Sequence, residues 1–393
     1  METARRHPSL VVSLVTAVAA RTVINTARRL PYPFAPDLAR HLGVPLAGIT
    51  AMIAASQLAA LLGPIAGPLA DRKGPRVLLL AGMALTAAGM ATGALDTYTA
   101  VFAGVLMASV GKAVFDPAVQ AHVGARVALP ARGRAVGLVE TAWAGSTLVG
   151  IPVVGWVADR TGWPGAFGFL AGLGVLGIAG LAWAFPLAAD PSRESPRGNP
   201  AGVLRERRAR AALAFGFLVS LANDNLFVVY GALLESRFGL GLAALGASTA
   251  VVGLAELSGE GLTAAVSDRI GLTRALGWGT ALTAAAYLVL PLSVRALPLA
   301  LGALYGVFVC FEFTVVTSFS VCTEVAPGAR ATFLSLYFAV LGLGRMVGAL
   351  IGAPVWAWGG IWATAGVSAG VTLLAGLVLS RSGLRLAPAV RSG

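Results

Sequence analysis

Charged side chains are scarce in this chain of 393 residues, because Asp, Glu, Lys and Arg together make up 12% against 57% for apolar types. A soluble domain carries about 25% charged residues. The sequence therefore has too few polar side chains to cover a soluble enzyme of this size, and its hydrophobicity excludes intrinsic disorder. Segments of about ten residues with alternating polarity, typical of membrane β-barrels, are also missing.

Residues that build metal, disulfide or nucleotide sites are few. The two cysteines, Cys310 and Cys322, lie within one apolar stretch, and the three histidines lack ligand spacing. The sequence has no Gly-x-x-x-x-Gly-Lys-[Ser/Thr] run, so ATP is not expected to be the energy source. No Ser-His-Asp group stands out either. We expect a protein without cofactor, metal or enzymatic activity.

Long apolar runs fill most of the chain instead. A run of about 20 residues is long enough to cross a bilayer as a helix. Twelve such helices are predicted, at 9–36, 46–70, 76–94, 98–125, 134–158, 164–187, 211–236, 243–266, 273–292, 296–322, 331–356 and 361–380. The sequence thus predicts an all-α membrane protein, and the first run is expected to be retained because no small-residue cleavage site follows it.

One loop is longer than the others. Residues 188–210 contain three prolines and the run Arg205-Glu206-Arg207-Arg208. We predict a basic cytoplasmic linker there, between an N-terminal six-helix bundle (1–187) and a C-terminal six-helix bundle (211–393) that ends in a short cytoplasmic tail.

Basic residues are distributed unevenly between the two sets of loops. The loops on the side of the N-terminus hold twenty of the 29 Lys and Arg residues, and the opposite loops hold four. This asymmetry follows the positive-inside rule, which predicts a multi-pass protein of the cytoplasmic membrane with both termini in the cytoplasm. A basic face also suits anionic lipid headgroups, so the net charge of +12 needs no nucleic-acid partner.

The two halves of the chain repeat each other. Asp71-Arg72-Lys73-Gly74 follows the second predicted helix, and Asp268-Arg269-Ile270-Gly271 follows the eighth, 197 positions later. Pro130 and Pro327, in the loops after helices 4 and 10, are separated by the same 197 positions. Two pairs at one offset predict a duplicated six-helix unit. Parallel repeats of this kind place a substrate site near the bilayer midplane, between the halves.

The loop after the second helix carries a recognisable motif. It reads Gly67-Pro68-Leu69-Ala70-Asp71-Arg72-Lys73-Gly74-Pro75-Arg76 and resembles the loop signature of the major facilitator superfamily. The segment from Gly145 to Gly155, with Gly150 and Pro152 between them, is similar to the helix 5 antiporter motif of drug:proton exchangers in that superfamily.

This resemblance implies a transporter that works by alternating access, as a monomer. It also implies a charge latch that holds the cytoplasmic side shut in the outward-open state, although a solvated turn that only orients the helices is the alternative. The residues expected in this cytoplasmic gate are Asp71, Arg72, Gly74, Arg76, Asp268 and Arg269.

Charged residues inside the predicted helices are candidates for function, since a charge at the bilayer centre costs several kcal/mol. The basic ones are Arg21, Arg28, Arg29, Lys112 and Arg345, and the acidic ones are Asp116, Glu140, Asp224, Glu256, Glu260 and Glu312. Near-balance between the two signs indicates pairing within the bundle rather than a pore of one sign.

Helix 1 and its counterpart helix 7 hold the first candidates. Arg21, Asn25 and Arg28 follow i, i+4, i+7 and share one face, whereas Arg29 is expected to extend outward to the headgroups. We expect Arg21 and Asn25 to face a central cavity, with an interhelical hydrogen bond as the alternative.

In helix 7, Asn223-Asp224-Asn225 cannot all face lipid. Asp224 is the first candidate for a carboxylate that carries protons, and a permanently paired structural role is its alternative.

Other charged residues suggest local pairs. Lys112 and Asp116 are i, i+4 on helix 4 and are predicted to pair, and Glu312 with Arg345 would form a substrate clamp or gate. Glu140 and Glu260 lie nearer the cytoplasm, so a gate or helix-end role suits them better. Glu256 shares one helix face with Glu260. Aromatic residues that are candidates for a cavity wall are Tyr32, Phe115, Trp143, Phe227, Tyr230, Phe311 and Tyr337.

These features together predict a secondary transporter, most simply one that exports a small amphipathic compound in exchange for protons. Proton-coupled uptake of a small organic anion or sugar, held by Arg21 or Arg345, is the first alternative. Translocation of lipid between leaflets is another. The expected partners are the substrate, protons and membrane lipids.

Overall fold

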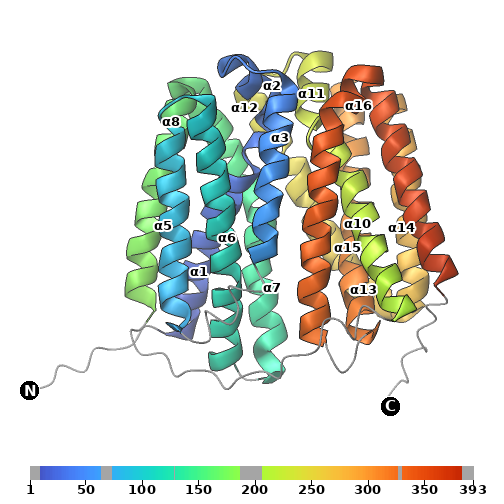
Figure 1. Ribbon diagram of the computed structural model, residues 1–393, viewed down its shortest axis with the longest axis horizontal. Helices are drawn as coiled ribbons and strands as arrows, with labels where there is room; N and C mark the ends of the chain where they lie inside the picture. Colours follow the sequence, from blue (N-terminus) through green and yellow to red (C-terminus); the bar gives the residue numbers. More distant parts are fainter. Residues whose placement is uncertain (1–8, 63–72, 128, 186–205, 326–329, 383–393) are drawn as a thin grey trace, which may run out of the picture. The chain divides into compact units, whose positions relative to one another are not determined.

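The computed structural model describes residues 9–62, 73–127, 129–185, 206–325 and 330–382. In these ranges all regular elements are helices (Figure 1). The chain folds into two compact units, which are described separately: unit 1 contains Met1–Leu30 and Ala59–Ser195, and unit 2 contains Pro31–Leu58 and Pro196–Gly393.

Unit 1 is built from four long helices and two shorter segments. They are α1 (Leu10–Arg29), α5 (Pro75–Gly93), α6 (Tyr98–Arg126), α7 (Leu129–Gly145), the π-helix η2 (Ser146–Gly150) and α8 (Ile151–Ala184). The 3₁₀ helix η1 (Leu58–Leu62) lies where the chain enters this unit. The hydroxyls of Ser9 and Thr97 accept hydrogen bonds from the first turns of α1 and α6, which caps these helices.

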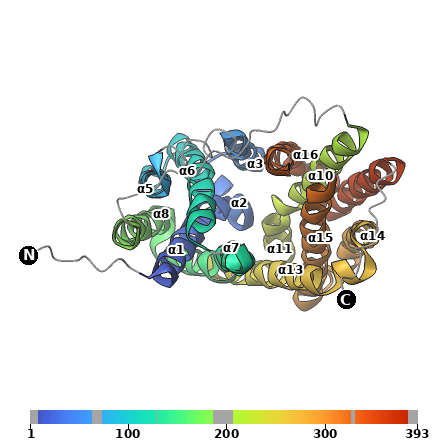
Figure 2. The same cartoon turned by 90° about the horizontal axis from the view of Figure 1, so that it is seen from below.

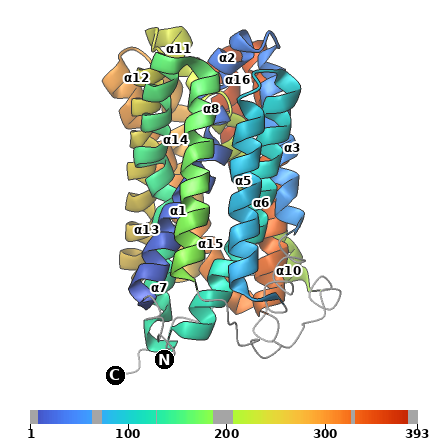
Figure 3. The same ribbon diagram turned by 90° about the vertical axis from the view of Figure 1, so that its left-hand side faces the viewer.

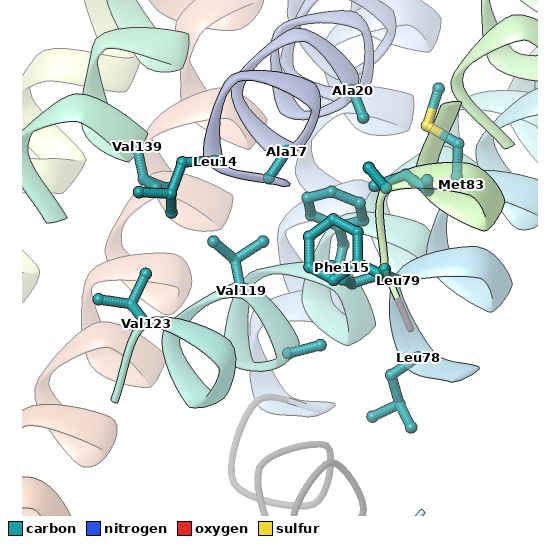
Figure 4. Close-up of a cluster of buried hydrophobic side chains, with 14 of the residues drawn as sticks. Leu14, Ala17, Ala20, Leu78, Leu79, Met83, Phe115, Val119, Val123 and Val139 are labelled. Atoms are coloured by element: carbon teal, nitrogen blue, oxygen red, sulfur yellow. The ribbon is translucent and has the colours of Figure 1, made fainter. Parts of the chain in front are cut away.

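Apolar side chains from all four long helices form the core of unit 1. Leu14 and Ala17 of α1 lie beside Val119 of α6 and Val139 of α7 in Figure 4. The long helices α1, α5, α6 and α8 run side by side in Figure 3, and glycines bring α5 and α6 close together. A Cβ at Gly82 would lie 2.6 Å from the carbonyl oxygen of Gly111. Small residues at such contacts let helices approach in lipid.

Unit 2 contains the remaining helices. They are α2 (Pro31–His41), α3 (Leu46–Gln57), α10 (Arg207–Phe227), α11 (Tyr230–Phe238), α12 (Leu242–Ser248), α13 (Ala250–Ile270), α14 (Leu272–Ser293), α15 (Leu297–Val325) and α16 (Arg330–Arg381).

Close packing between α10 and α16 is the main feature of unit 2, and Figure 2 shows the two helices beside each other. Gly344, Gly348 and Gly352 recur every four residues on α16, and a Cβ at each would collide with the backbone or side chains of α10 and the residue that follows it. This glycine face is one reason why the apolar segment Arg207–Phe238, which contains α10 and α11, is 83% buried over its most apolar part. It therefore holds the polar residues of α10 away from lipid.

The predicted first helix, 9–36, is divided in the structure. α1 ends at Arg29 and α2 begins at Pro31, with α1 in unit 1 and α2 in unit 2. Pro31, Pro33 and Pro36 lack the N–H groups that an uninterrupted helix would use here. Predicted helix 7, 211–236, is likewise divided into α10 and α11.

Two very long helices are bent rather than continuous. Gly162 interrupts α8 with φ 71°, and Gly359 and Gly360 interrupt α16. These breaks lie at the predicted ends of helices 5 and 11. Only glycine reaches positive φ without strain, which explains the residue type at Gly162 and Gly360.

The duplicated unit predicted from sequence is visible in the backbone. Positive-φ glycines form three pairs: Gly43 with Gly239, Gly74 with Gly271, and Gly162 with Gly360. Their separations are 196, 197 and 198 residues, which matches the offset of the loop motif. The pair Gly74 and Gly271 precedes α5 and α14, with similar φ and ψ in both.

The number of membrane crossings agrees with the prediction. Nine helices of the described part are long and apolar enough to cross a membrane, and two of these have 48 and 49 residues. Since about 20 residues suffice for one crossing, each of these two crosses twice, with its break between the crossings. The shorter apolar helix Leu46–Leu62 completes a twelve-helix fold.

Candidate functional site

Arg21 of α1 is the centre of a buried charge network in unit 1. Its Nε lies 2.9 Å from Asp116 Oδ1 on α6, and its Nη1 lies 2.9 Å from Glu140 Oε2 on α7. Nη1 also donates to the carbonyl oxygen of Val139 at 2.8 Å. The guanidinium fits this role because its five N–H donors can serve several acceptors at once. Arg21 thus ties three helices together.

Lys112 completes this network from α6. Its Nζ donates to Asp116 Oδ2 at 2.7 Å, which confirms the pair predicted from the i, i+4 spacing. Asp116 therefore faces two cations, Arg21 and Lys112. The side chains of Asp116 and Glu140 are 29% and 40% exposed, whereas that of Arg21 is 7% exposed, so the carboxylates form the accessible side of the network.

A second residue on the same face of α1 as Arg21 also contacts α7. Asn25 Nδ2 donates to the carbonyl oxygen of Ala142 at 3.1 Å, so this side chain makes the interhelical bond that was the alternative to facing a cavity. Arg28 is partly buried on α1.

The prediction that Arg29 extends to the headgroups is wrong. Arg29 is 3% exposed, and its Nη1 donates to the carbonyl oxygen of Trp143 at 3.3 Å. The guanidinium carbon also lies 4.3 Å from the centre of the Trp143 ring, over which Lys112 lies at 5.5 Å. A cation over an indole is attracted by the ring's negative face. Trp143 therefore stabilises the two cations, Arg29 and Lys112, inside unit 1.

The helix 5 motif coincides with a local change of helix type. Ile151 N–H donates to the carbonyl oxygen of Ser146, five residues earlier, and Pro152 has no N–H to donate. Such π-turns often occur at functional sites. Gly150 packs directly on α1, where a Cβ would overlap Thr26, while Gly155 is buried within α8.

Replacing Gly150 with Ala is expected to destabilise the protein by about 1–3 kcal/mol, as overpacking of a close helix contact does. Gly145 is the matched control, since a Cβ there would lie at 3.6 Å from Thr22, an ordinary contact. Gly145→Ala should leave stability unchanged or raise it slightly, because Ala favours helix. Thermal unfolding of both variants in detergent measures the difference, and equal melting temperatures would contradict the close contact.

Asp224 of α10 is the centre of a second network, which lies in unit 2. The hydroxyl of Tyr32 donates to Asp224 Oδ1 at 3.0 Å, and Gln57 Nε2 donates to the Tyr32 oxygen at 2.7 Å. Arg345 approaches from α16, with its Nε 3.8 Å from Asp224 Oδ2. Asp224 is 1% exposed. The carboxylate is thus buried between a neutral donor and a cation.

The two asparagines beside Asp224 differ in their surroundings. Asn225 donates to the carbonyl oxygen of Thr364 at 3.1 Å and to Ser368 Oγ at 3.0 Å, and Ser368 in turn donates to the carbonyl oxygen of Ala222. These bonds tie α10 to α16. Asn223 is 4% exposed, and its carboxamide oxygen is buried without a hydrogen-bond partner among the described residues.

Aromatic rings lie next to Asp224. Phe227 is 4.4 Å from Tyr32, 5.3 Å from Tyr230 and 5.3 Å from Phe308, between ring centres. The structure thus brings together three of the predicted aromatic candidates. Phe115 belongs instead to the core of unit 1, while Phe311 and Tyr337 belong to that of unit 2.

The remaining acidic candidates lie on α13 and α15. Glu256 and Glu312 are 4% and 8% exposed, and Glu260 is partly buried. Gly259 makes room for Glu312, because a Cβ there would lie 2.7 Å from the Glu312 Cβ. The predicted pairing of Glu312 with Arg345 stays a prediction, whereas Arg345 Nε lies 3.8 Å from the carboxylate of Asp224.

Parts of the predicted gate lie outside the described residues, namely Asp71 and Arg72, and nothing is described of the Asp268 side chain. Gly74 adopts φ 79° and Gly271 adopts φ 88°, so both loops turn tightly into the next helix. Arg76 is partly buried and Arg269 is exposed.

Two polar groups were missed by sequence reasoning. Gln57 is the only carboxamide in the apolar run 46–62, and that isolation was the available signal. Arg40 of α2 lies 2.5 Å from Glu235 of α11 and 3.1 Å from Asp37. Local helix spacing could not reveal this pair, because Arg40 and Glu235 are 195 residues apart.

A duplicated twelve-helix fold with buried ion pairs inside apolar helices defines a secondary transporter, in which such charges mark substrate or ion pathways. The sequence profile of the Major Facilitator Superfamily matches residues 17–217. The chain belongs to this superfamily. It is therefore a multi-pass membrane protein for secondary transport of a small molecule and not an enzyme.

Relatives along the whole chain agree with this assignment. The uncharacterized MFS-type transporter YceJ of Bacillus subtilis (strain 168) is 26% identical over 337 residues, which cover 84% of this chain and 85% of the relative. The uncharacterized MFS-type transporter YwfA of the same strain is 23% identical over 356 residues, covering 88% and 86%.

Solved structures share the fold. A bacterial homologue of the human lysosomal transporter Spinster, in an inward-facing and occupied conformation, matches with a TM-score of 0.77 and 15% identity over 96% of this chain and 98% of the homologue. The human organic anion transporter MFSD10 (TETRAN) matches with a TM-score of 0.65 and 20% identity, covering 95% and 100%.

Proposed function

We propose that the protein exports a small amphipathic compound from the cytoplasm in exchange for protons. In this proposal it is a monomer in the cytoplasmic membrane, with both termini in the cytoplasm, as the distribution of basic loops predicts. The observation that carries the proposal is the buried Asp224, which lies between the Tyr32 hydroxyl and the Arg345 guanidinium.

Proton coupling follows from the chemistry of this group. A carboxylate that has a cation beside it favours the charged form, and a buried carboxylate without one favours the protonated form. If movement of α16 separates Arg345 from Asp224, the carboxylate takes up a proton, and if the pair re-forms, the proton leaves. The Arg345 Nε lies 3.8 Å from Asp224 Oδ2, so the two charges are close enough for a shift of α16 to change their attraction.

The preference for an amphipathic substrate rests on the rings beside this carboxylate. Tyr32, which bonds Asp224, packs against Phe227, and Phe227 in turn contacts Tyr230 and Phe308. Aromatic surface thus adjoins one acidic group. Ligand sites combine an apolar lining with a few placed polar groups. A compound with an apolar body and one polar or cationic group matches that combination.

Alternating access would be carried by the two halves, 1–187 and 211–393, joined by the linker 188–210. We assign the Arg21 network to the substrate and proton pathway of the first half, with Asp116 and Glu140 as its accessible carboxylates. The cytoplasmic gate would use the two loops that turn at Gly74 and Gly271. The π-turn at Ser146–Gly150 packs against α1. We assign it the role of letting helix 5 move relative to α1.

A small organic anion is the second candidate substrate, and charge is the observation that favours it. Away from their end residues, the predicted helices of the first half hold two acidic residues, Asp116 and Glu140, against four basic ones: Arg21, Arg28, Arg29 and Lys112. Guanidinium groups are suited to carboxylates and phosphates. MFSD10, which shares the fold, is itself described as an organic anion transporter.

The test is transport into liposomes that contain the purified protein, with amphipathic cations, organic anions and sugars as the panel. Antiport predicts that a compound accumulates when the lumen is more acidic than the outside, because protons then leave as it enters. Accumulation of an amphipathic cation under this gradient supports the leading proposal, and accumulation of an anion supports the second candidate. Accumulation only under the opposite gradient would overturn export in favour of uptake.

Tyr32→Phe and Gln57→Leu are expected to lower the rate of coupled transport by a similar factor of up to about tenfold. Each variant breaks one bond of the chain from Gln57 through Tyr32 to Asp224, and a buried hydrogen bond contributes about 1 kcal/mol. Tyr32→Phe keeps the ring that packs on Phe227. The control is Tyr98→Phe, which belongs to unit 1 and takes no part in this chain of hydrogen bonds. Initial rates in liposomes measure all three variants. A normal rate in Tyr32→Phe would remove the hydroxyl from the mechanism.

A further inference from the structure

A cavity in unit 2 is lined by residues that belong to neither charge network. It has a volume of about 190 Å³ and lies among α13, α14 and α15. Its walls are formed by Leu262, Val266, Ile270, Trp278, Gly279, Leu282, Val309, Cys310 and Phe313. Trp278 and Leu282 are 65% and 53% exposed, so the cavity opens at the surface of the unit.

Two arginines lie next to cavity-lining residues along α13 and α14. α13 ends at Ile270, which lines the cavity, and Arg269 immediately precedes it. Arg274 lies one turn before Trp278 on α14, and residues at i and i+4 share a helix face. Both arginines are exposed. They flank the tight turn at Gly271, which joins α13 to α14. The apolar residues that line the cavity lie along these two helices and α15.

We propose that this cavity binds one acyl chain of an anionic phospholipid, whose phosphate is held by Arg269 and Arg274. Charge complementarity carries the choice of ligand, because two exposed arginines flank the turn between two of the helices that line a wholly apolar cavity. Basic residues at the membrane surface attract anionic headgroups, and guanidinium binds phosphate through paired hydrogen bonds. Arg269 also belongs to the predicted cytoplasmic gate, but lipid binding here does not depend on the proposed transport function.

The size and lining of the cavity argue against a transported compound. Sites that enclose a drug-sized ligand have roughly 300–1,000 Å³ and a few placed polar groups. This cavity is smaller, and its walls carry no charged side chain. A flexible hydrocarbon chain fits such a narrow, open space, and burial of each methylene contributes about 0.8 kcal/mol relative to water.

The test uses Trp278 as a reporter. Phospholipids with brominated acyl chains are titrated into the full-length protein in detergent, as phosphatidylglycerol or as phosphatidylcholine, and quenching of tryptophan fluorescence is recorded. The contribution of Trp278 is the difference between the wild type and Trp278→Phe. Trp362, which is 62% exposed on α16, gives a matched reporter away from the two arginines through Trp362→Phe.

We expect Trp278 to be quenched at lower concentrations of phosphatidylglycerol than of phosphatidylcholine, by about 30-fold. Two arginines near a surface each contribute about a factor of five. Arg269→Gln combined with Arg274→Gln should abolish this preference, whereas Arg208→Gln, another exposed arginine, should preserve it. Equal quenching by both lipids in the wild type would overturn the proposal, as would a preference that survives the double substitution.

Discussion

Asp224→Asn is expected to reduce proton-driven transport to the level of liposomes without protein. The amide has the same shape and still accepts the hydrogen bond from Tyr32, but it can neither bind a proton in the transport cycle nor form an ion pair with Arg345. Uptake of the substrate found in the panel is measured under an imposed pH gradient. No other acidic residue is present in α10 (Arg207–Phe227), so none on the same helix can replace Asp224.

A second readout separates loss of coupling from loss of folding. Exchange of labelled for unlabelled substrate at equal pH and equal concentration needs substrate binding but no net movement of protons. We expect this exchange to persist in Asp224→Asn. The control Asp159→Asn changes an exposed carboxylate of α8 and should transport normally. Full gradient-driven transport in Asp224→Asn would remove Asp224 from proton coupling.

Arg21→Met is expected to cost about 3 kcal/mol of stability. Removal of one partner from a buried ion pair typically costs about 3–5 kcal/mol, and the lower end applies because Asp116 and Glu140 are partly exposed. Asp116 keeps Lys112, but Glu140 and the carbonyl of Val139 lose the guanidinium. Unfolding in denaturant measures the loss, and Arg21→Lys should recover only part of it because an ammonium lacks the planar fork.

Arg160→Met provides the matched control. Arg160 lies on α8 with its guanidinium 3.9 Å from the Trp156 ring, but it is exposed. Surface substitutions usually change stability by no more than about 0.5 kcal/mol. A double substitution, Arg21→Met with Glu140→Gln, should cost less than the two single changes added together. Strict additivity would mean that the Arg21–Glu140 contact contributes nothing.

Local patterns in the sequence predicted the fold and the nearest pairs correctly. Apolar runs and loop glycines identify twelve crossings. A segment must be long enough to span the bilayer, and its backbone N–H and C=O groups must be hydrogen-bonded within a helix. Lys112 and Asp116 were predicted to pair because four residues separate them on one helix. The i, i+4 rule could not reveal that Arg21 also binds Asp116 and Glu140, since these partners are 95 and 119 positions away.

Errors arose where packing decides the environment of a side chain. Arg29 was expected at the headgroups, because a long cation near a helix end commonly extends there. In the structure, the Arg29 guanidinium instead packs over the ring of Trp143, which lies on a helix more than a hundred residues away in sequence. Gln57 was missed because its role depends on Tyr32, and their contact follows from the way α2 and α3 fold together in unit 2.

The most direct test of proton exchange is the direction of proton movement that the substrate itself causes. Protein-containing liposomes with a pH-sensitive dye in the lumen are prepared without any gradient, and the substrate is added outside. Antiport predicts that the lumen becomes alkaline as substrate enters and protons leave, and that Asp224→Asn abolishes the signal. Acidification of the lumen, or substrate entry without any change in pH, would contradict the proposed exchange.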